Sequence, residues 1–254
     1  MDISKLDKNS EWFKNLNGRI EPTPISRDFS GSAYGIFSDG HNRGGIIPNN
    51  ILRNTYNNPN IKVVSLKDRE TSGWSKVDNN VGNIATIMDH AISHSIRIIN
   101  FANRFGDDDK STKFNKEENK ELLRTAIQNF GNANGLMIVT AGWRGDGGRE
   151  INDSFPHYPT SLGLDNVITV AMARVGNDNI ARLMGPNGAV SGNMSNWGGQ
   201  TVDLVADFLL STDTVASSYM PSEVSRVAAM IMYERPSLSA LQVRYRRCLE
   251  ASRL

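Results

Sequence analysis

The sequence predicts an α/β fold in which a doubly wound, mostly parallel sheet is covered by helices on both faces. Short runs rich in valine and isoleucine alternate with stretches of helical periodicity along the chain. These runs are apolar at nearly every position, which is typical of strands in a sheet that is buried on both faces. The alternation of strand and helix requires right-handed crossovers, and such connections make neighbouring strands parallel.

Five apolar segments are expected to form the strands. Their ranges are 61–66, 96–102, 135–141, 166–173 and 201–206. The intervening segments that are rich in glycine, asparagine and aspartate are expected to be loops, because these residues favour turns. The 254 residues contain no internal repeat and no long linker, so the chain (1–254) is expected to form a single domain.

Helices are expected between the strands and in the C-terminal part of the sequence. Two sets of apolar residues have helical spacing: Ile84, Ile87, Met88, Ala91 and Ile92, then Leu122, Leu123, Ala126, Ile127 and Phe130. The acidic pair Glu117 and Glu118 precedes the second set and suits the positive end of a helix dipole. Two more helices are expected over 222–234 and 236–252, the latter capped by Ser237 or Ser239.

The composition argues against nucleic acid and membranes as partners and against a disulfide. The 28 Lys and Arg residues nearly match the 27 Asp and Glu residues, so neither nucleic acid nor an anionic membrane is expected as a partner. Cys248 is the one cysteine, which excludes an intrachain disulfide. Residues 1–19 lack the apolar core of a signal peptide, and no run of about 18 apolar residues could span a bilayer.

The segment 139–148, VTAGWRGDGG, places four glycines directly after a predicted strand. Glycines at such a place could cradle a phosphate or form a backbone pocket for a developing oxyanion. A phosphate site needs a helix straight after the loop, whereas here two prolines and a glycine follow without a helical period. The pattern therefore argues against nucleotide binding.

Several segments resemble, in the right order, the subtilisin-like serine proteases (subtilases, peptidase S8). GLMIVTAG, the glycine loop, HYPTS and DNVITVA resemble a strand ending Ala-Gly-Asn, a glycine loop, Tyr-Pro-Ala and Asn-Val-Ile-Thr-Val. MSNWGGQTVDLVA, IRIINFA and the pair of C-terminal helices resemble other parts of the same family. The resemblance implies a serine endopeptidase fold, a peptide or protein substrate and a family whose members are mostly secreted.

The resemblance also implies an Asp/His/Ser triad, in that order along the chain. KLDKNSEWFKNLNGRI places Asp7 at the acid. SDGHNRGG places His41 at the base, or Asp39 when the segment is aligned without gaps. ASSYMPSEVSRVAAM places Ser218 at the nucleophile, or Ser217 when the alignment is anchored on the proline. Ser218 is preferred, because that register keeps a valine on the apolar face of the following helix.

The substrate-binding positions implied by the resemblance lie in two segments. They are Asn100, Phe101, Ala102, Asn103, Ala141 and Gly142. Subtilases use an Asn as oxyanion donor where this chain has Trp143, whose indole offers a single N–H donor. No cofactor is expected. Calcium is suggested by the resemblance alone, and the acidic segment 106–113 lacks the ligand spacing of an EF-hand loop.

Departures from the family pattern collect at the catalytic positions. The oxyanion Asn and the His motif are altered, and Pro48 is expected to end the helix that follows the base. A triad acts as a unit, so the loss of one member removes most of the rate. Two functions are therefore expected to compete: a serine endopeptidase of weak or absent activity, and a pseudoprotease that binds a peptide or protein. The missing start of the first strand leaves open that the chain is part of a longer precursor.

Overall fold

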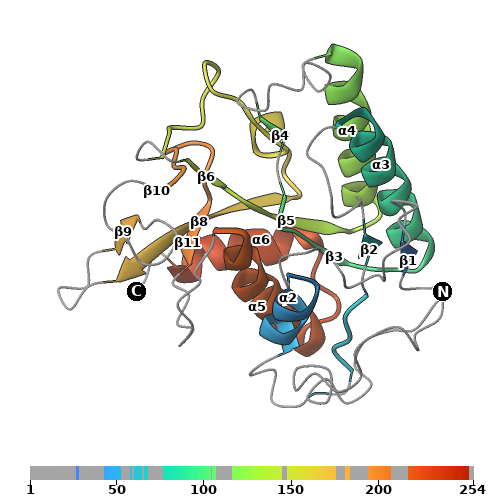
Figure 1. Cartoon of the computed structure of the whole chain (residues 1–254). Helices are drawn as coiled ribbons and strands as arrows, with labels where there is room; N and C mark the ends of the chain where they lie inside the picture. The colour runs from blue at the N-terminus through green and yellow to red at the C-terminus, as the bar shows by residue number, and fades with distance from the viewer. Residues whose placement is uncertain are drawn as a thin grey trace.

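The computed structural model describes twelve stretches of the chain. They are residues 27–28, 43–52, 58, 60–64, 66–67, 77–103, 105–106, 116–144, 148–175, 181–183, 194–206 and 217–251. Figure 1 shows a central sheet with one group of helices on each side of it. In the described part of the chain, no helix is long and apolar enough to cross a membrane.

The main sheet is built from four parallel strands and one antiparallel strand. Its order is β11 (Leu204–Ala206), β8 (Val167–Val175), β5 (Leu136–Thr140) and β3 (Ile98–Phe101), and these four run parallel. β9 (Ala181–Leu183) pairs antiparallel with β8. The prediction of a mostly parallel α/β sheet is confirmed, and four of the five expected strands form it.

Within the described residues, which leave out Ser65, the fifth expected strand, 61–66, does not join this sheet. β2 covers only Leu66–Lys67 and pairs with β1 (Arg27–Asp28) in a separate two-stranded sheet. Ile61, at the start of the segment, is buried and packs in a small cluster with Leu52. Ile61 thus packs against α2, whereas Leu66 packs against the α3/α4 core. Periodicity over six residues cannot distinguish such a segment from one buried strand.

The helices cover both faces of the main sheet. α3 (Val77–Ser93) and α4 (Glu117–Asn132) pack on one face. α5 (Met220–Glu234) and α6 (Ala240–Ala251) pack on the other face, and α2 (Arg43–Leu52) packs against α5. Figure 1 shows this separation, with α3 and α4 on one side of β5 and the red α5 and α6 on the other.

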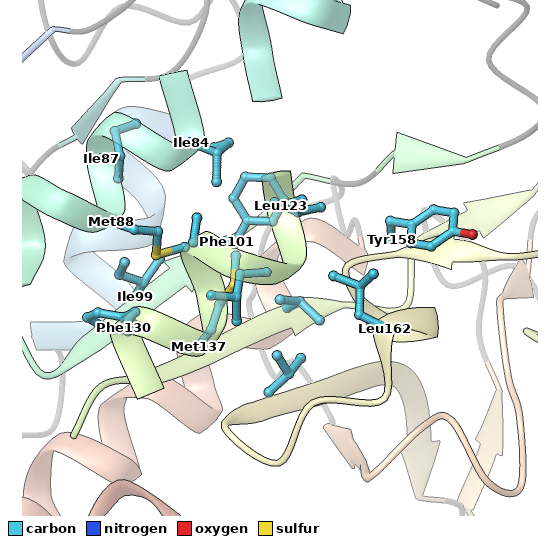
Figure 2. Close-up of a cluster of buried hydrophobic side chains, with 14 of the residues drawn as sticks. Ile84, Ile87, Met88, Ile99, Phe101, Leu123, Phe130, Met137, Tyr158 and Leu162 are labelled. Carbon is cyan, nitrogen blue, oxygen red and sulfur yellow. The ribbon is translucent and has the colours of Figure 1, made fainter. Parts of the chain in front are cut away.

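Strand β5 divides the core because its side chains alternate between the two faces. Met137 and Val139 belong to the α3/α4 core, and Leu136 and Ile138 belong to the α5/α6 core. All four side chains are fully buried. Figure 2 shows the α3/α4 core, where side chains from both helices gather over the strands, with Tyr158 and Leu162 at one side of the cluster.

The helix ends follow the expected signals in two cases. α4 begins with Glu117 and Glu118, as the dipole argument requires. Before α6, the backbone N–H of Gln242 donates to Ser239 Oγ at 3.1 Å, and the N–H of Ser239 donates to Gln242 Oε1 at 2.8 Å. This reciprocal pair is a capping box, so the cap is Ser239 rather than Ser237.

The expectation that Pro48 ends its helix is wrong. α2 continues past Pro48 to Leu52. A proline inside a helix removes one backbone hydrogen bond and costs about 3 kcal/mol. Burial compensates here, because Pro48 and Leu52 are buried and Ile47 packs against the α5/α6 core.

Two short strand pairs and one 3-10 turn lie next to these helices and strands. β6 (Trp143–Arg144) pairs antiparallel with β10 (Met194–Ser195), and β4 (Phe105–Gly106) pairs antiparallel with β7 (His157–Tyr158). The 3-10 turn η4 (Ser217–Tyr219) leads directly into α5.

Candidate active site

The candidate site lies at the carboxyl edge of the main sheet. β3 and β5 end side by side, with Phe101 opposite Val139. The chain therefore continues into Ala102–Asn103 and into Ala141–Gly142 at neighbouring points of the same edge. In open α/β sheets, ligands bind outside this edge, and the structure brings the two predicted substrate segments together there.

Gly142 makes the turn that follows β5. Its φ is +72°, a left-handed conformation that favours glycine. Its N–H donates to Thr140 Oγ1 at 3.0 Å, and its carbonyl accepts from the N–H of Asn196 at 3.0 Å. The first glycine of the segment 139–148 is thus required by backbone geometry, and both of its backbone groups are engaged within the protein.

Asn196, which directly follows β10, holds the same turn through hydrogen bonds of its side chain. Its side chain is 5% exposed, and its Nδ2 donates to the carbonyl of Ala141 at 2.9 Å. Its Oδ1 accepts from the backbone N–H of Arg149 at 3.0 Å. The neighbouring hydroxyl of Ser195 accepts from the N–H of Met172 at 3.0 Å, which links the turn to β8.

The serine turn η4 sits beside the glycine turn. Ser217, Ser218 and Tyr219 are all buried. Thr140 Oγ1 donates to the carbonyl of Ser217 at 3.0 Å. The hydroxyl of Ser218 is buried and has no hydrogen-bond partner within the described residues. A buried hydroxyl in this state calls for an explanation, because nearly all such groups are paired in native proteins.

Helix α2 is tied to the serine turn by buried polar groups. Asn50 Nδ2 donates to Ser222 Oγ at 3.4 Å, and Ser222 Oγ donates to the carbonyl of Tyr219 at 2.5 Å. Asn50 and Ser222 are 1% and 0% exposed. α2 also packs directly against η4. The predicted base precedes Arg43, the first residue of α2, along the sequence.

Three predicted triad positions lie outside the described residues. They are Asp7, Asp39 and His41. Of the triad, the described structure therefore contains the nucleophile position alone, as Ser218 with its alternative Ser217. The acidic segment 106–113 also lies outside the described residues, apart from Gly106.

The predicted substrate segment on β3 has its side chains engaged in the interior. Phe101 belongs to the α3/α4 core, and Asn100 Oδ1 accepts from Ser225 Oγ of α5 at 3.2 Å. Ala102 and Asn103 are half-buried just beyond the strand. In the described part of the chain β3 pairs with β5 alone, so one backbone edge of β3 has no strand partner there.

Two tryptophans stand at the glycine turn. Trp143 follows Gly142 and is 42% exposed, and Trp197 follows Asn196 and is 43% exposed. Trp143 lies opposite Ser195 in the β6–β10 pair. Trp143, the residue at the predicted oxyanion position, therefore projects at the protein surface rather than into the core.

The sequence did not indicate the roles of Thr140, Asn50 and Asn196. Thr140 carries the one weak signal, a hydroxyl at the end of the otherwise apolar run Leu136–Thr140. Asn196 lies in a segment that resembles the subtilase pattern, but its partners are about 50 residues away and cannot be found by spacing. Within the described residues, no three His, Cys, Asp or Glu side chains form a group that could hold a metal ion.

Comparison with solved structures identifies the fold. A lanthipeptide protease aligns with 91% of this chain and 74% of its own length, with a TM-score of 0.64 and 14% sequence identity. The serine protease MycP1 of the type VII (ESX-1) secretion system covers 73% of this chain, with a TM-score of 0.52 and 16% identity. Sphericase covers 74%, with a TM-score of 0.50 and 19% identity.

The chain has a subtilisin-like fold, as the resemblance predicted. It spans 58% of MycP1 and 59% of sphericase. No family model matches the chain, and no curated protein matches its sequence.

Proposed function

We propose that this chain is a subtilisin-like serine endopeptidase domain in which Ser218 attacks the peptide carbonyl. His41 takes the proton from the serine hydroxyl, and Asp7 orients the imidazole. The observation that carries the proposal is the buried Ser218 hydroxyl, which finds no hydrogen-bond partner within the described residues. A nucleophilic serine needs a base within hydrogen-bond reach, and the segment before α2 would supply it.

The choice of His41 over Asp39 follows from acid–base chemistry. A free Asp has a pKa of about 3.9 and is a poor base for a serine hydroxyl, whereas His has a pKa of about 6.5. His41 precedes the first residue of α2 by two positions, and α2 is tied to the serine turn through Asn50 and Ser222. Asn50 lies near the C-terminal end of α2, seven residues beyond Arg43, so the preference for His41 rests on its pKa and on the resemblance.

The choice of Ser218 over Ser217 has two supports. The register that makes Ser218 the nucleophile requires Val224 on the apolar face of α5, and Val224 is buried in the α5/α6 core. The hydroxyl without a partner in the described part of the chain is also that of Ser218.

The proposed substrate is an extended peptide that lies along the backbone edge of β3 beyond Asn100. That edge has no strand partner within the described residues, and an edge strand can pair with an added peptide strand. The structural neighbours described above include two that are proteases by name. Peptide or protein substrates are therefore the class of partner that we propose.

We propose that the activity is weak. The N–H of Gly142 is engaged by Thr140, and Trp143 replaces the Asn that donates to the oxyanion in subtilases. Removing one such donor costs about 10²- to 10³-fold in rate. Hydrolysis would then depend on Ser218 and its base with reduced stabilisation of the oxyanion.

The test is labelling of the purified, folded chain by a fluorophosphonate probe. Slow labelling is expected, and it is lost in Ser218→Ala and in His41→Ala but retained in Ser217→Ala. If labelling is lost in Ser217→Ala and retained in Ser218→Ala, the nucleophile is Ser217 instead of Ser218. A folded chain that takes up no probe would contradict the enzyme proposal.

A pseudoprotease is the second candidate function, and the engaged Gly142 together with Trp143 favours it. In that case the chain binds an extended peptide along β3 without cleaving it. Binding of a fluorescent peptide library to the Ser218→Ala variant, measured by anisotropy, tests this candidate. Peptides that bind the native chain and remain intact support it, whereas cleavage of the bound peptides contradicts it.

A further inference from the structure

Thr140 joins two turns of the candidate site that are far apart in the sequence. It is the last residue of β5 and is 3% exposed. Its hydroxyl donates to the carbonyl of Ser217, 77 residues away, at 3.0 Å. The same oxygen accepts from the N–H of Gly142 at 3.0 Å. One hydroxyl therefore bridges the glycine turn and the serine turn.

The two hydrogen bonds explain why a hydroxyl is present at this position. The other residues of β5 are apolar and fully buried, and a valine would fill nearly the same volume as Thr140. Burying a hydroxyl is unfavourable unless it is hydrogen-bonded. Here the donor and one acceptor site of the hydroxyl are both used.

The two hydrogen bonds also fix the direction in which the Thr140 hydroxyl proton points. A hydroxyl has a single proton, and the N–H of Gly142 can only donate, so the Thr140 proton points toward the Ser217 carbonyl. The peptide between Ser217 and Ser218 is thereby held at a set orientation. The backbone of the proposed nucleophile is thus positioned relative to Gly142, next to the predicted oxyanion position at Trp143.

We propose that Thr140 is a positioning residue that sets the geometry between the Ser217–Ser218 turn and the Gly142 turn. This inference rests on the proposed serine hydrolase function of the same site. Thr140 acts through the two turns and touches neither the substrate nor the reacting atoms. Catalytic geometry tolerates little displacement, and a shift of about 1 Å can cost 10²-fold in rate.

The experiment compares Thr140→Val, which removes the hydroxyl and keeps the shape, with Thr140→Ser, which keeps the hydroxyl. Thr169→Val is the matched control. Thr169 is 1% exposed on the neighbouring strand β8, and its hydroxyl donates to Thr160 Oγ1 at 3.0 Å, away from the serine turn. All variants are compared in fluorophosphonate labelling rate, in urea denaturation and in amide hydrogen exchange.

The labelling rate of Thr140→Val is expected to fall about 10- to 100-fold. Thr140→Ser restores the rate, and Thr169→Val leaves it unchanged although it is destabilised like Thr140→Val. Equal rates for Thr140→Val and the native chain would overturn the inference, as would an equal fall in Thr169→Val.

Hydrogen exchange separates failure of this inference from failure of the proposed function. In Thr140→Val, peptides that contain Gly142 and Ser217 are expected to exchange faster together, and Thr169→Val leaves both unchanged. A native chain that takes up no probe would reject the hydrolase proposal, and with it the role of Thr140 in positioning a nucleophile. Unchanged exchange in Thr140→Val would reject the bridge itself.

Discussion

At the scale of the residue, Gly142 illustrates how a backbone angle limits the side chain. Its φ of +72° is a conformation that costs other L-residues roughly 1–2 kcal/mol. Its N–H and its carbonyl both bond within the protein, so the turn cannot relax without losing those bonds.

Gly142→Ala is therefore expected to lower the free energy of unfolding by about 1–2 kcal/mol and to slow labelling of Ser218. Gly163→Ala is the matched control. Gly163 has a φ of +63°, and an added Cβ there would meet no atom within 4 Å in the described part of the chain. Urea denaturation should show similar losses for both variants. Slower labelling in Gly163→Ala as well would mean that strain alone, and not the site, accounts for the effect.

Single residues of the site were partly predictable from sequence. Gly142 and Ser218 stand in motifs whose order along the chain resembles a family, and the structure places them in neighbouring turns. Their functional roles stay predictions. Thr140 and Asn196 act through partners that lie 77 and 55 residues away. Such pairs depend on which strand ends meet, and sequence spacing carries no information about that.

At the scale of the element, the contact of α2 with α5 ties α2 to the serine turn that carries the predicted nucleophile. The buried amide of Asn50 lies on α2 and donates to Ser222 of α5, which in turn bonds the carbonyl of Tyr219 in the serine turn. A helix that carries a proline in its interior depends on such contacts, because its own hydrogen bonding is incomplete.

Asn50→Ala is expected to cost about 0.5–1.5 kcal/mol of stability, the usual net value of one hydrogen bond, and to slow labelling of Ser218. Asn166→Ala is the control, because Asn166 Nδ2 donates to the carbonyl of Ile127 in α4, on the opposite face of the sheet. Thermal denaturation and labelling should be measured on both variants. Unchanged labelling in Asn50→Ala at reduced stability would show that α2 does not position the site.

The sequence predicted some helices well and predicted α2 and the segment 61–66 poorly, for physical reasons. α3, α4 and α5 have a clear apolar face, and sequence periodicity finds such helices. The helix signal of α2 is interrupted by Pro48, and the cost of that proline is offset by burial against other parts of the chain. The segment 61–66 has the composition of a strand, but among its described residues only Leu66 belongs to one, β2, and Ile61 packs against α2.

At the scale of the whole molecule, one sheet separates two cores that share strand β5. Met137 faces the α3/α4 core and Ile138 faces the α5/α6 core, and each is 0% exposed. Because adjacent residues of one strand belong to different cores, neither core can lose its packing without disturbing the strand that carries the other.

Met137→Ala and Ile138→Ala are each expected to lower the free energy of unfolding by about 2–5 kcal/mol, through loss of buried apolar surface and the cavity left behind. Both variants should unfold in a single transition, which fluorescence and circular dichroism report at the same urea concentration. Val205→Ala is the control, because Val205 is 52% exposed and should change little. Two separate transitions would contradict a single cooperative unit, and with it the prediction of one domain.

The exposed indoles at the glycine turn have a spectroscopic consequence. Trp143 and Trp197 each follow one member of the hydrogen-bonded pair Gly142 and Asn196, and both face solvent. The chain has two other tryptophans, Trp12 and Trp74, which lie outside the described residues. A peptide that covers the turn should remove water from at least one indole and shift its emission to shorter wavelength, and Trp143→Phe and Trp197→Phe should each remove part of that shift. The protein thus carries an intrinsic optical reporter at its candidate site, so occupancy can be followed without a label or turnover.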